Sequence, residues 1–155
     1  MKLSEFIVSE AIIPNLASTE RDGVLRELVS SLADAGALPQ GAIDEVLAEI
    51  LKREQKGSTG FGKGVAVPHV KHALVQKMAG TIGRSEGGVD FAAVDHQPVY
   101  TVVLLLSPEN QPQQHLQAMH VIFDNLQDDM FRRFLKQSTT RQAITELLEE
   151  ADQGR

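Results

Sequence analysis

A chain of 155 residues, with 42% hydrophobic and 23% charged residues, is long enough to form one domain with a full hydrophobic core. The absence of cysteine excludes disulfides, thiolate metal ligands and cysteine nucleophiles, and is compatible with a reducing compartment. A net charge of −6 without a basic stripe argues against a nucleic-acid-binding protein. Because there is neither an apolar run of roughly 18 residues nor a secretion signal, we expect no membrane insertion and a single cytoplasmic domain over residues 1–155.

The first third of the chain predicts short pieces followed by two amphipathic helices. Short apolar pieces end at Pro14-Asn15, which predicts a helical turn and then an edge strand; their residues are Phe6, Ile7, Ala11, Ile12 and Ile13. Ser18 or Thr19 can cap the first helix, and Gly36 can end it. The apolar residues of that helix are Val24, Leu25, Leu28, Val29 and Leu32, and those of the second are Ile43, Val46, Leu47, Ile50 and Leu51. The second helix is expected to end near Arg53.

A glycine-rich loop and a short apolar strand then lead to a Pro-His step. Glycines at positions 57, 60, 62 and 64 allow the loop to fold tightly beside the strand 65–67. Pro68 lacks the N–H that would continue strand pairing, so the pattern predicts that His69 is presented where the strand ends. An isolated Pro-His pair can equally be an ordinary loop histidine that bonds its neighbours.

The same loop matches the spacing of a nucleotide-binding P-loop, because Gly57 to Lys63 reads G-x-x-x-x-G-K. A P-loop needs a strand before it, a helix after it, and Ser or Thr directly after the lysine. Here a helix pattern precedes the loop, a strand pattern follows it, and Gly64 follows the lysine. We therefore expect no nucleotide site.

The second half of the chain predicts two more strands and three helices. Residues 70–77 are polar and are expected to be irregular, residues 78–84 predict a strand, and residues 87–91 and 95–98 predict turns. Residues 99–106 form the most apolar stretch, which predicts a central strand buried on both faces and closed by Ser107-Pro108. A helix from about 114 to 126, a short one around Phe131, and a last one capped by Thr139 or Thr140 follow. The expected apolar face of the first of these helices is Leu116, Met119, Ile122, Phe123 and Leu126.

Several polar residues have both a functional and an ordinary interpretation. Arg53 can pair with the carbonyls at its helix end, or it can offer a guanidinium fork to an anionic group near His69. His115, at the start of a helix, can be an exposed first-turn residue or part of a site. A metal site made by His69, His72 and His115 lacks a His-Glu-x-x-His helix or an adjacent carboxylate, so we expect no metal. The remaining histidines, His72, His96 and His120, are interpreted as surface residues.

The run from Ser58 to His69, Ser-Thr-Gly-Phe-Gly-Lys-Gly-Val-Ala-Val-Pro-His, resembles the signature of the mannitol/fructose-type enzyme IIA domains of the bacterial phosphotransferase system, including the nitrogen-regulatory members. The Arg-Glu pair before it, and the later run Gly-Val-Asp-Phe with Asp-x-Gln-Pro-Val, are also similar to that family. The resemblance covers nearly the whole chain. Departures are Phe61 in place of the more usual Ile, the extra charge of Lys63, and an unusual continuation after His115-Leu116.

This resemblance implies an α/β fold, with a mixed five-stranded sheet flanked by helices on both faces, and it implies roles for three residues. His69 would accept and donate a phosphoryl group, His115 would donate a hydrogen bond to the phosphoryl oxygens and orient the ring, and Arg53 would stabilise charge. Backbone N–H groups of the glycine loop are expected to help as an anion nest. No cofactor is implied, because the incoming phosphohistidine already carries the transfer potential.

The function implied is that of a phosphocarrier that receives phosphate from phospho-HPr and either passes it on or signals by its phosphorylation state. The sequence of residues 53–60, Arg-Glu-Gln-Lys-Gly-Ser-Thr-Gly, favours a nitrogen-regulatory role. One alternative is a fructose- or mannitol-specific IIA subunit that feeds a separate IIB/IIC permease. Another is a regulatory binding module without transfer, against which the joint presence of Arg53, His69 and His115 argues.

Overall fold

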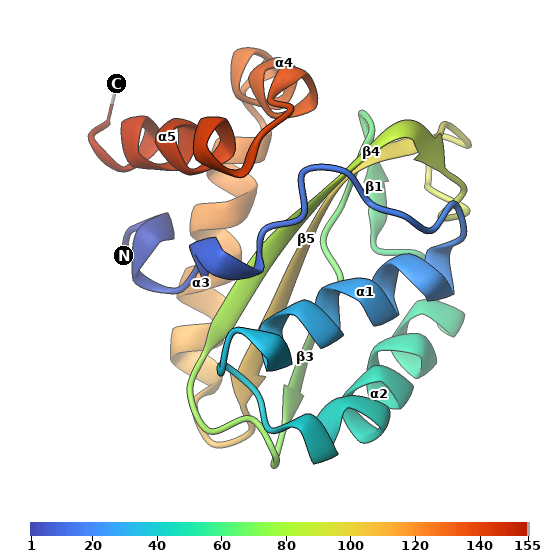
Figure 1. Cartoon of the computed structure of the whole chain (residues 1–155), viewed down its shortest axis with the longest axis vertical. Helices are drawn as coiled ribbons and strands as arrows, with labels where there is room; N and C mark the ends of the chain where they lie inside the picture. The colour runs from blue at the N-terminus through green and yellow to red at the C-terminus, as the bar shows by residue number, and fades with distance from the viewer. Residues whose placement is uncertain (155) are drawn as a thin grey trace.

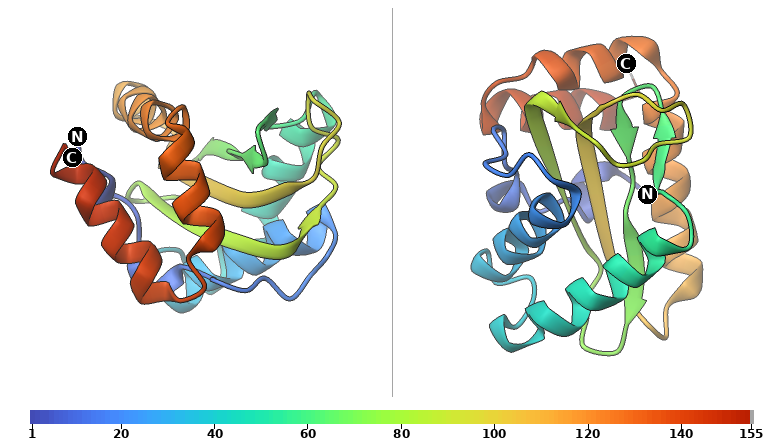
Figure 2. Two further views of the ribbon diagram at one scale, coloured as in Figure 1. Left: turned by 90° about the horizontal axis from the view of Figure 1, so that it is seen from above. Right: turned by 90° about the vertical axis from the view of Figure 1, so that its right-hand side faces the viewer.

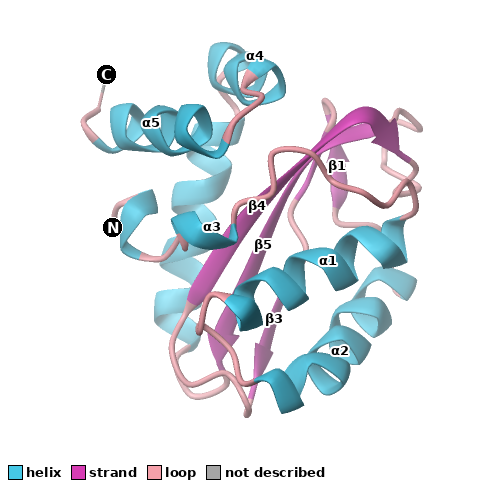
Figure 3. Cartoon of the chain, in the orientation of Figure 1, coloured by secondary structure: helices cyan, strands magenta, loops and turns pink. Residues whose placement is uncertain are grey.

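The computed structural model describes residues 1–154, which form helices on both faces of a mixed sheet (Figures 1 and 3). The helices are α1 (Arg21–Asp34), α2 (Ile43–Gln55), α3 (Pro112–Leu126), α4 (Asp129–Gln137) and α5 (Arg141–Asp152). The strands are β1 (Gly60–Gly62), β2 (Val65–Ala66), β3 (His69–His72), β4 (Ala79–Val89) and β5 (Val99–Pro108). Three short 3-10 helices are η1 (Leu3–Glu5), η2 (Ser9–Ala11) and η3 (Gln40–Ala42). The predicted fold class is therefore confirmed.

The apolar strand β5 lies at the centre of the sheet, as predicted. Strand β4 pairs with it antiparallel on one side, and β2 and β3 pair with it parallel on the other. Because Val65 lies opposite Thr101 and His69 lies opposite Leu105, β2 and β3 keep one register along β5 and are two segments of a single interrupted strand. Strand β1 completes a hairpin with β2.

Pro68 interrupts this strand without ending it. Its carbonyl still accepts the N–H of Leu105 at 3.0 Å, and pairing resumes at His69. The expectation of irregular structure directly after His69 is therefore wrong for residues 69–72, which are strand β3. Their polar composition suits this position, because β3 pairs with β5 alone and leaves its other edge open.

Alternation along β5 divides the core into two layers. Val102, Leu104 and Leu106 belong to the cluster formed with α1 and α2, whereas Val103 and Leu105 belong to the cluster formed with α3, α4 and α5. Figure 2 shows the two groups of helices on opposite sides of the sheet. Within residues 1–154 no helix has the length and hydrophobicity needed to cross a membrane.

The first two helices follow their predicted patterns, and the main difference lies at a cap. Gly36 has φ of +82° at the end of α1, as a glycine stop requires. The N-cap of α1 is Glu20 rather than Ser18 or Thr19. The Ser18 hydroxyl instead accepts the N–H of Glu20, and the Glu27 carboxylate accepts the N–H of Ser18 at 2.6 Å.

Two strand predictions need correction. The N-terminal edge strand is absent from the described residues, where Ile7 and Ile13 make only isolated bridges to Gly80 and Gly83 between the short helices. Strand β4 continues to Val89, through residues expected to form a turn. Its register shifts between Arg84 and Val89, so the Gly87-Gly88 pair lies within an irregular stretch of the strand rather than ending it.

Helix α3 is rotated relative to its predicted apolar face. Leu116 is 62% exposed, whereas His115 is only 8% exposed and lies on the buried face with Ala118, Ile122 and Leu126. The Asp128 carboxylate caps α4, and the Thr140 hydroxyl caps α5 by accepting the N–H of Ala143 at 3.0 Å. The cap predicted for the last helix is thus confirmed at Thr140.

Candidate functional site

Arg53, His69 and His115 line one hollow of about 260 Å³, where the end of α2, the start of β3 and the first turns of α3 meet. The centroids of the two imidazole rings are 5.6 Å apart. Hollows of about 340 and 620 Å³ lie elsewhere on the molecule, so chemistry rather than size distinguishes this one. The structure brings together the three residues that the sequence singled out.

The lining of this hollow is strongly cationic. Lys52, Arg53, Lys56 and Lys71 line it, against a single carboxylate from Glu49. The whole chain carries a net charge of −6, so this concentration of positive charge runs against the average of the molecule. A cleft lined by one sign of charge attracts ligands of the opposite sign. The hollow therefore suits an anion.

His69 has a defined tautomer. Val65, Val67 and His69 lie on the same face of the interrupted strand, towards α3, and the His69 Nδ1 is 2.7 Å from the Val67 carbonyl oxygen. Because a carbonyl can only accept, Nδ1 carries the proton and donates it to this bond. The Nε2 atom consequently bears the lone pair. The sequence alone does not distinguish between the two ring nitrogens.

The surroundings of His69 favour its neutral form. Burial is the largest influence that lowers the pKa of His69, and the nearby Arg53 charge lowers it further, while the bond to the Val67 carbonyl opposes the shift. A lowered pKa leaves the imidazole neutral near pH 7. Its Nε2 lone pair is then available as a nucleophile.

His115 is held by a serine that sequence analysis did not identify. The His115 Nδ1 lies 2.7 Å from the hydroxyl oxygen of Ser107, which is fully buried at the end of β5. Alternation along β5 places Ser107 on the same face as Val103 and Leu105, beneath α3. The sequence contains one signal that could have identified Ser107, namely a serine at the end of an otherwise apolar strand. Only the structure shows that this serine faces the helix that carries His115.

His115 remains neutral over the physiological range. Burial, followed by the charges of His69 and Lys71, lowers the pKa of His115 from its ordinary value of 6.5 to about 4. A neutral ring carries one N–H. When the Ser107 hydroxyl donates to Nδ1, that proton is on Nε2, which is the form needed to donate a hydrogen bond into the hollow.

The lowered pKa of His115 predicts a loss of stability on acidification. Between pH 6.5 and 4 the unfolded chain protonates this residue and the folded chain does not, so the stabilisation is complete above pH 6.5 and disappears as the pH falls towards 4. The expected loss from pH 7 to 4.5 is about 2 kcal/mol of unfolding free energy. Urea unfolding measures the free energy of unfolding at pH 7 and at pH 4.5. The decrease between these two pH values should be smaller by about 2 kcal/mol in His115→Gln than in the parent protein. Equal losses in both proteins would contradict the assignment.

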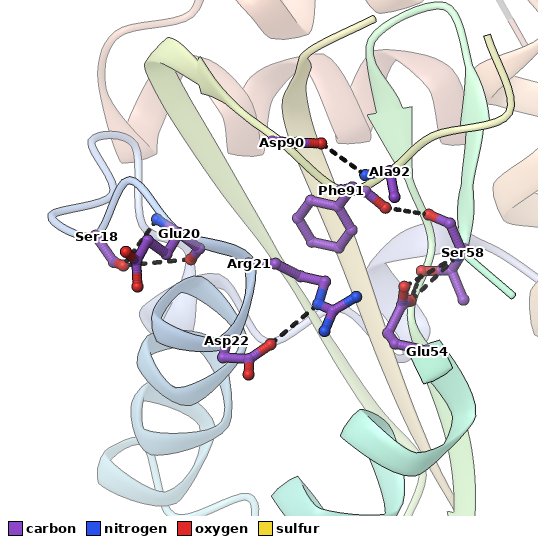
Figure 4. Close-up of polar contacts among 10 residues, drawn as sticks. Ser18, Glu20, Arg21, Asp22, Glu54, Ser58, Asp90, Phe91 and Ala92 are labelled. Carbon is purple, nitrogen blue, oxygen red and sulfur yellow. Dashed lines mark hydrogen bonds and ion pairs between the residues drawn. The ribbon is translucent and has the colours of Figure 1, made fainter. Parts of the chain in front are cut away.

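Arg53 and Glu54 fix the junction between α2 and the glycine loop. The Arg53 Nη1 donates to the Gly57 carbonyl at 2.7 Å, a loop carbonyl just beyond the helix end. Glu54 is 3% exposed, and its carboxylate accepts the N–H and the hydroxyl of Thr59. The Ser58 hydroxyl donates to the Phe91 carbonyl at 2.6 Å (Figure 4). Arg53 thus bonds to a loop carbonyl rather than to the helix-end carbonyls expected for it, and this bond occupies only one arm of the guanidinium.

The glycine loop does not form an anion nest at His69. Its residues make the β1–β2 hairpin, and several of its N–H groups are already bonded within the protein. The N–H of Thr59 bonds to Glu54, that of Gly60 to the Ser58 hydroxyl, and that of Lys63 to the Asp95 carboxylate at 3.0 Å. The hairpin tip therefore contacts Asp95 rather than the histidines, and the expectation of a nest is wrong for these three groups.

The other histidines lie apart from the hollow. His72 is three residues beyond His69 on β3 and so points to the other face of the strand, where its Nδ1 accepts the N–H of Leu74 at 3.0 Å. His96 and His120 are exposed, as predicted, whereas His72 is half-buried. Residues 1–154 contain no group of three or more His, Cys, Asp or Glu side chains arranged to hold a metal ion.

Comparisons with known proteins agree on one family. Residues 5–151 match the family model described as "Phosphoenolpyruvate-dependent sugar phosphotransferase system, EIIA 2". A nitrogen regulatory protein of Bradyrhizobium diazoefficiens is 36% identical over 148 residues, which cover 96% of this chain and 95% of that protein. The fructose-specific EIIABC component of Bacillus subtilis is 34% identical over 153 residues, covering 98% of this chain and 24% of the relative. The crystal structure of the nitrogen regulatory protein IIA-Ntr from Neisseria meningitidis has a TM-score of 0.84 at 27% identity, covering 94% of this chain and 98% of that one.

Proposed function

The chain belongs to the EIIA 2 family of the phosphoenolpyruvate-dependent sugar phosphotransferase system, and we propose that it carries a phosphoryl group on Nε2 of His69. The observation that carries the proposal is the bond from His69 Nδ1 to the Val67 carbonyl, which leaves the Nε2 lone pair free. This nitrogen belongs to a ring that lines a cationic hollow beside His115. The hollow supplies the charge that a phosphoryl group requires.

The transfer step needs no proton movement at His69. The Nε2 lone pair attacks the phosphorus of an incoming phosphohistidine, the new N–P bond forms, and the donor's N–P bond breaks with its electron pair returning to the donor imidazole. Nδ1 stays protonated against the Val67 carbonyl throughout. In such a loose transition state, catalysis consists of positioning and charge stabilisation.

The residues around His69 provide the positioning and the charge stabilisation that the transfer step requires. The guanidinium of Arg53 and the ammonium of Lys71 offset the negative charge of the equatorial oxygens. A neutral His115, oriented by Ser107, donates its Nε2–H to a phosphoryl oxygen. The edge position of β3 leaves His69 half-buried, which keeps its ring within reach of a partner protein.

We place the protein between a phospho-HPr-like donor and a regulatory target, in the cytoplasm where such carriers meet. The match to a nitrogen regulatory protein over 95% of that relative's length supports the regulatory role. The similarity to the EIIA part of a fructose-specific EIIABC component supports a second candidate, transfer to a IIB partner for sugar uptake. A binding module without transfer has no such support, because Arg53, His69 and His115 share one hollow.

The test is phosphorylation with purified components. Incubation with phosphoenolpyruvate, enzyme I and HPr should add one phosphate that is labile in acid and stable in base, as expected of an N–P bond. Omission of HPr is the control. A protein that takes up no phosphate, or takes up a base-labile one, would refute the proposed function.

Replacing Arg53 with lysine separates its two roles. Lysine keeps the charge and can still reach the Gly57 carbonyl, so the melting temperature should change by only a degree or two. The fork that can grip a phosphoryl group is lost, and transfer through His69 should slow by about tenfold, or roughly 1.4 kcal/mol. Rapid-quench measurement of transfer from phospho-HPr gives the rate. A variant that melts several degrees lower but transfers at the parental rate would show that Arg53 is only structural.

A further inference from the structure

A second cationic hollow, of about 340 Å³, lies on the same face of the sheet as His69. It is bounded by the tip of the β1–β2 hairpin, the start of β5 and helix α4, towards the end of the sheet where α4 and β1 appear in Figure 1. Val65 in its wall precedes His69 by four residues, which places the two about 13 Å apart along the strand. The hollow shares no lining residue with the His69 site.

Three cations line this hollow against one carboxylate. The cations are Lys63, Arg132 and Lys136, and the carboxylate is Asp95. Both oxygens of Asp95 already accept backbone N–H groups, one from Lys63 at 3.0 Å and the other from Gln97 at 3.1 Å. Because Arg132 is itself paired with Asp129, the positive charge in excess of Asp95 comes from Lys63 and Lys136, and it favours an anion.

Two of these cations are held in place without a ligand. The Arg132 Nη1 donates to the Leu126 carbonyl at 2.6 Å, and its Nη2 pairs with Asp129. The Lys136 Nζ lies 3.9 Å from the centroid of the Tyr100 ring. Two glycine backbones pack closely against this ring. A Cβ at Gly64 would lie 3.4 Å from its Cδ2, and one at Gly88 would lie 3.1 Å from its Cε1.

Lys63 adopts a backbone conformation that lysine rarely takes. Its φ is +60° at the hairpin tip, a position that glycine, asparagine or aspartate occupies with less strain. Here the strained position presents an ammonium group, rather than a turn-forming side chain, at the rim of the hollow.

We propose that this hollow binds a small phosphate ester. The phosphate would contact Lys63 and Lys136, whereas Val65, Pro98 and Leu135 provide an apolar wall for the carbon skeleton and Thr101 a hydroxyl partner. The volume lies at the lower end of the range for small-molecule sites, which fits a sugar phosphate or nucleoside monophosphate rather than a larger cofactor. This binding goes beyond the proposed transfer reaction and does not depend on His69.

The experiment is an amide NMR titration of the full chain with glucose 6-phosphate, AMP, inorganic phosphate and sulfate. We expect saturable shifts at Lys63, Gly64, Tyr100 and Lys136 with at least one ester, and binding at least about tenfold weaker for the inorganic anions. No saturable shift with either ester, equal affinity for sulfate, or shifts confined to the His69 hollow would overturn the proposal. Binding of an acidic peptide in place of the esters would also overturn it, in favour of a protein partner.

Variants make the test specific. Lys63→Asn and Lys136→Gln should each weaken ester binding by about tenfold, the scale of one lost charge-assisted bond. Asparagine tolerates the φ of position 63, so Lys63→Asn should melt at or above the parental temperature and cannot fail through misfolding. Lys77→Gln removes a charge far from the hollow and should leave affinity unchanged. His69→Ala should also bind normally, which separates failure of this proposal from failure of the transfer function. Retained affinity in Lys63→Asn and Lys136→Gln would refute the site.

Discussion

Replacing His69 with alanine should abolish phosphorylation, with a loss of more than about a thousand-fold in the rate of phosphate uptake. The reason is that the acceptor atom itself disappears, while the cationic hollow remains. His115 cannot substitute for it. Its pKa of about 4 keeps the ring neutral, and the bond between Ser107 and Nδ1 leaves the proton on Nε2, which therefore has no lone pair for phosphorus. Mass spectrometry of the protein after incubation with phosphoenolpyruvate, enzyme I and HPr measures the loss.

The matched control is His72→Ala, which removes a histidine from the opposite face of the same strand. It should accept phosphate at the parental rate. His120→Ala serves the same purpose on the exposed side of α3. Undiminished labelling of His69→Ala, together with a loss of labelling in either control variant, would show that another histidine carries the phosphate.

His115→Ala is expected to accept phosphate and to pass it on slowly. Removal of one preorganised donor to a developing charge costs about 10- to 1000-fold in rate. Ser107→Ala should slow transfer less, since the serine acts only by orienting the His115 ring through the 2.7 Å bond to Nδ1. The double variant should be no slower than His115→Ala alone, because the two residues act as a unit. Single-turnover transfer from the phosphorylated protein to its acceptor gives the three rates.

The fold must be checked in parallel. His115 is buried, and its loss leaves the Ser107 hydroxyl without this partner, at a cost of about 1–3 kcal/mol. His115→Gln retains an amide that can bond to Ser107, so it separates stability from chemistry. If His115→Ala transferred at the parental rate, His115 would be a packing residue. If the effects of the two single variants were simply additive, Ser107 would not act through His115.

The sequence analysis selected His69 and Arg53, which line the candidate hollow, because their surroundings carry local signals. A glycine-rich loop, a short strand and a proline mark His69, and the end of an apolar stripe marks Arg53. Ser107 and the burial of His115 were missed for a shared reason. The predicted apolar face of the helix included Leu116, which is exposed. Only the contact with β5 determines that the face carrying His115 is buried. Long-range packing of this kind overrides the local periodicity.

The same limit explains the errors in the fold. The apolar runs of α1, α2 and β5 were predicted correctly, because burial of one stripe or of two faces leaves a strong pattern. Strand β3 was missed since its polar residues pair only with β5, at the edge of the sheet. The glycine loop was expected to reach His69, but the pairing of β1 with β2 directs its tip towards Asp95 and Tyr100. Each of these pairings depends on a partner distant in sequence.

We propose that Nε2 of His69 carries the phosphoryl group while Nδ1 stays protonated against the Val67 carbonyl. The most direct test is histidine-ring NMR of the ¹⁵N-labelled protein before and after phosphorylation by phospho-HPr. The bond to Val67 predicts that phosphorus coupling appears at Nε2 of His69 alone, with Nδ1 still protonated. Phosphorus coupling at Nδ1 of His69, or at any ring nitrogen of His115, would show that Nε2 of His69 is not the phosphorylated atom.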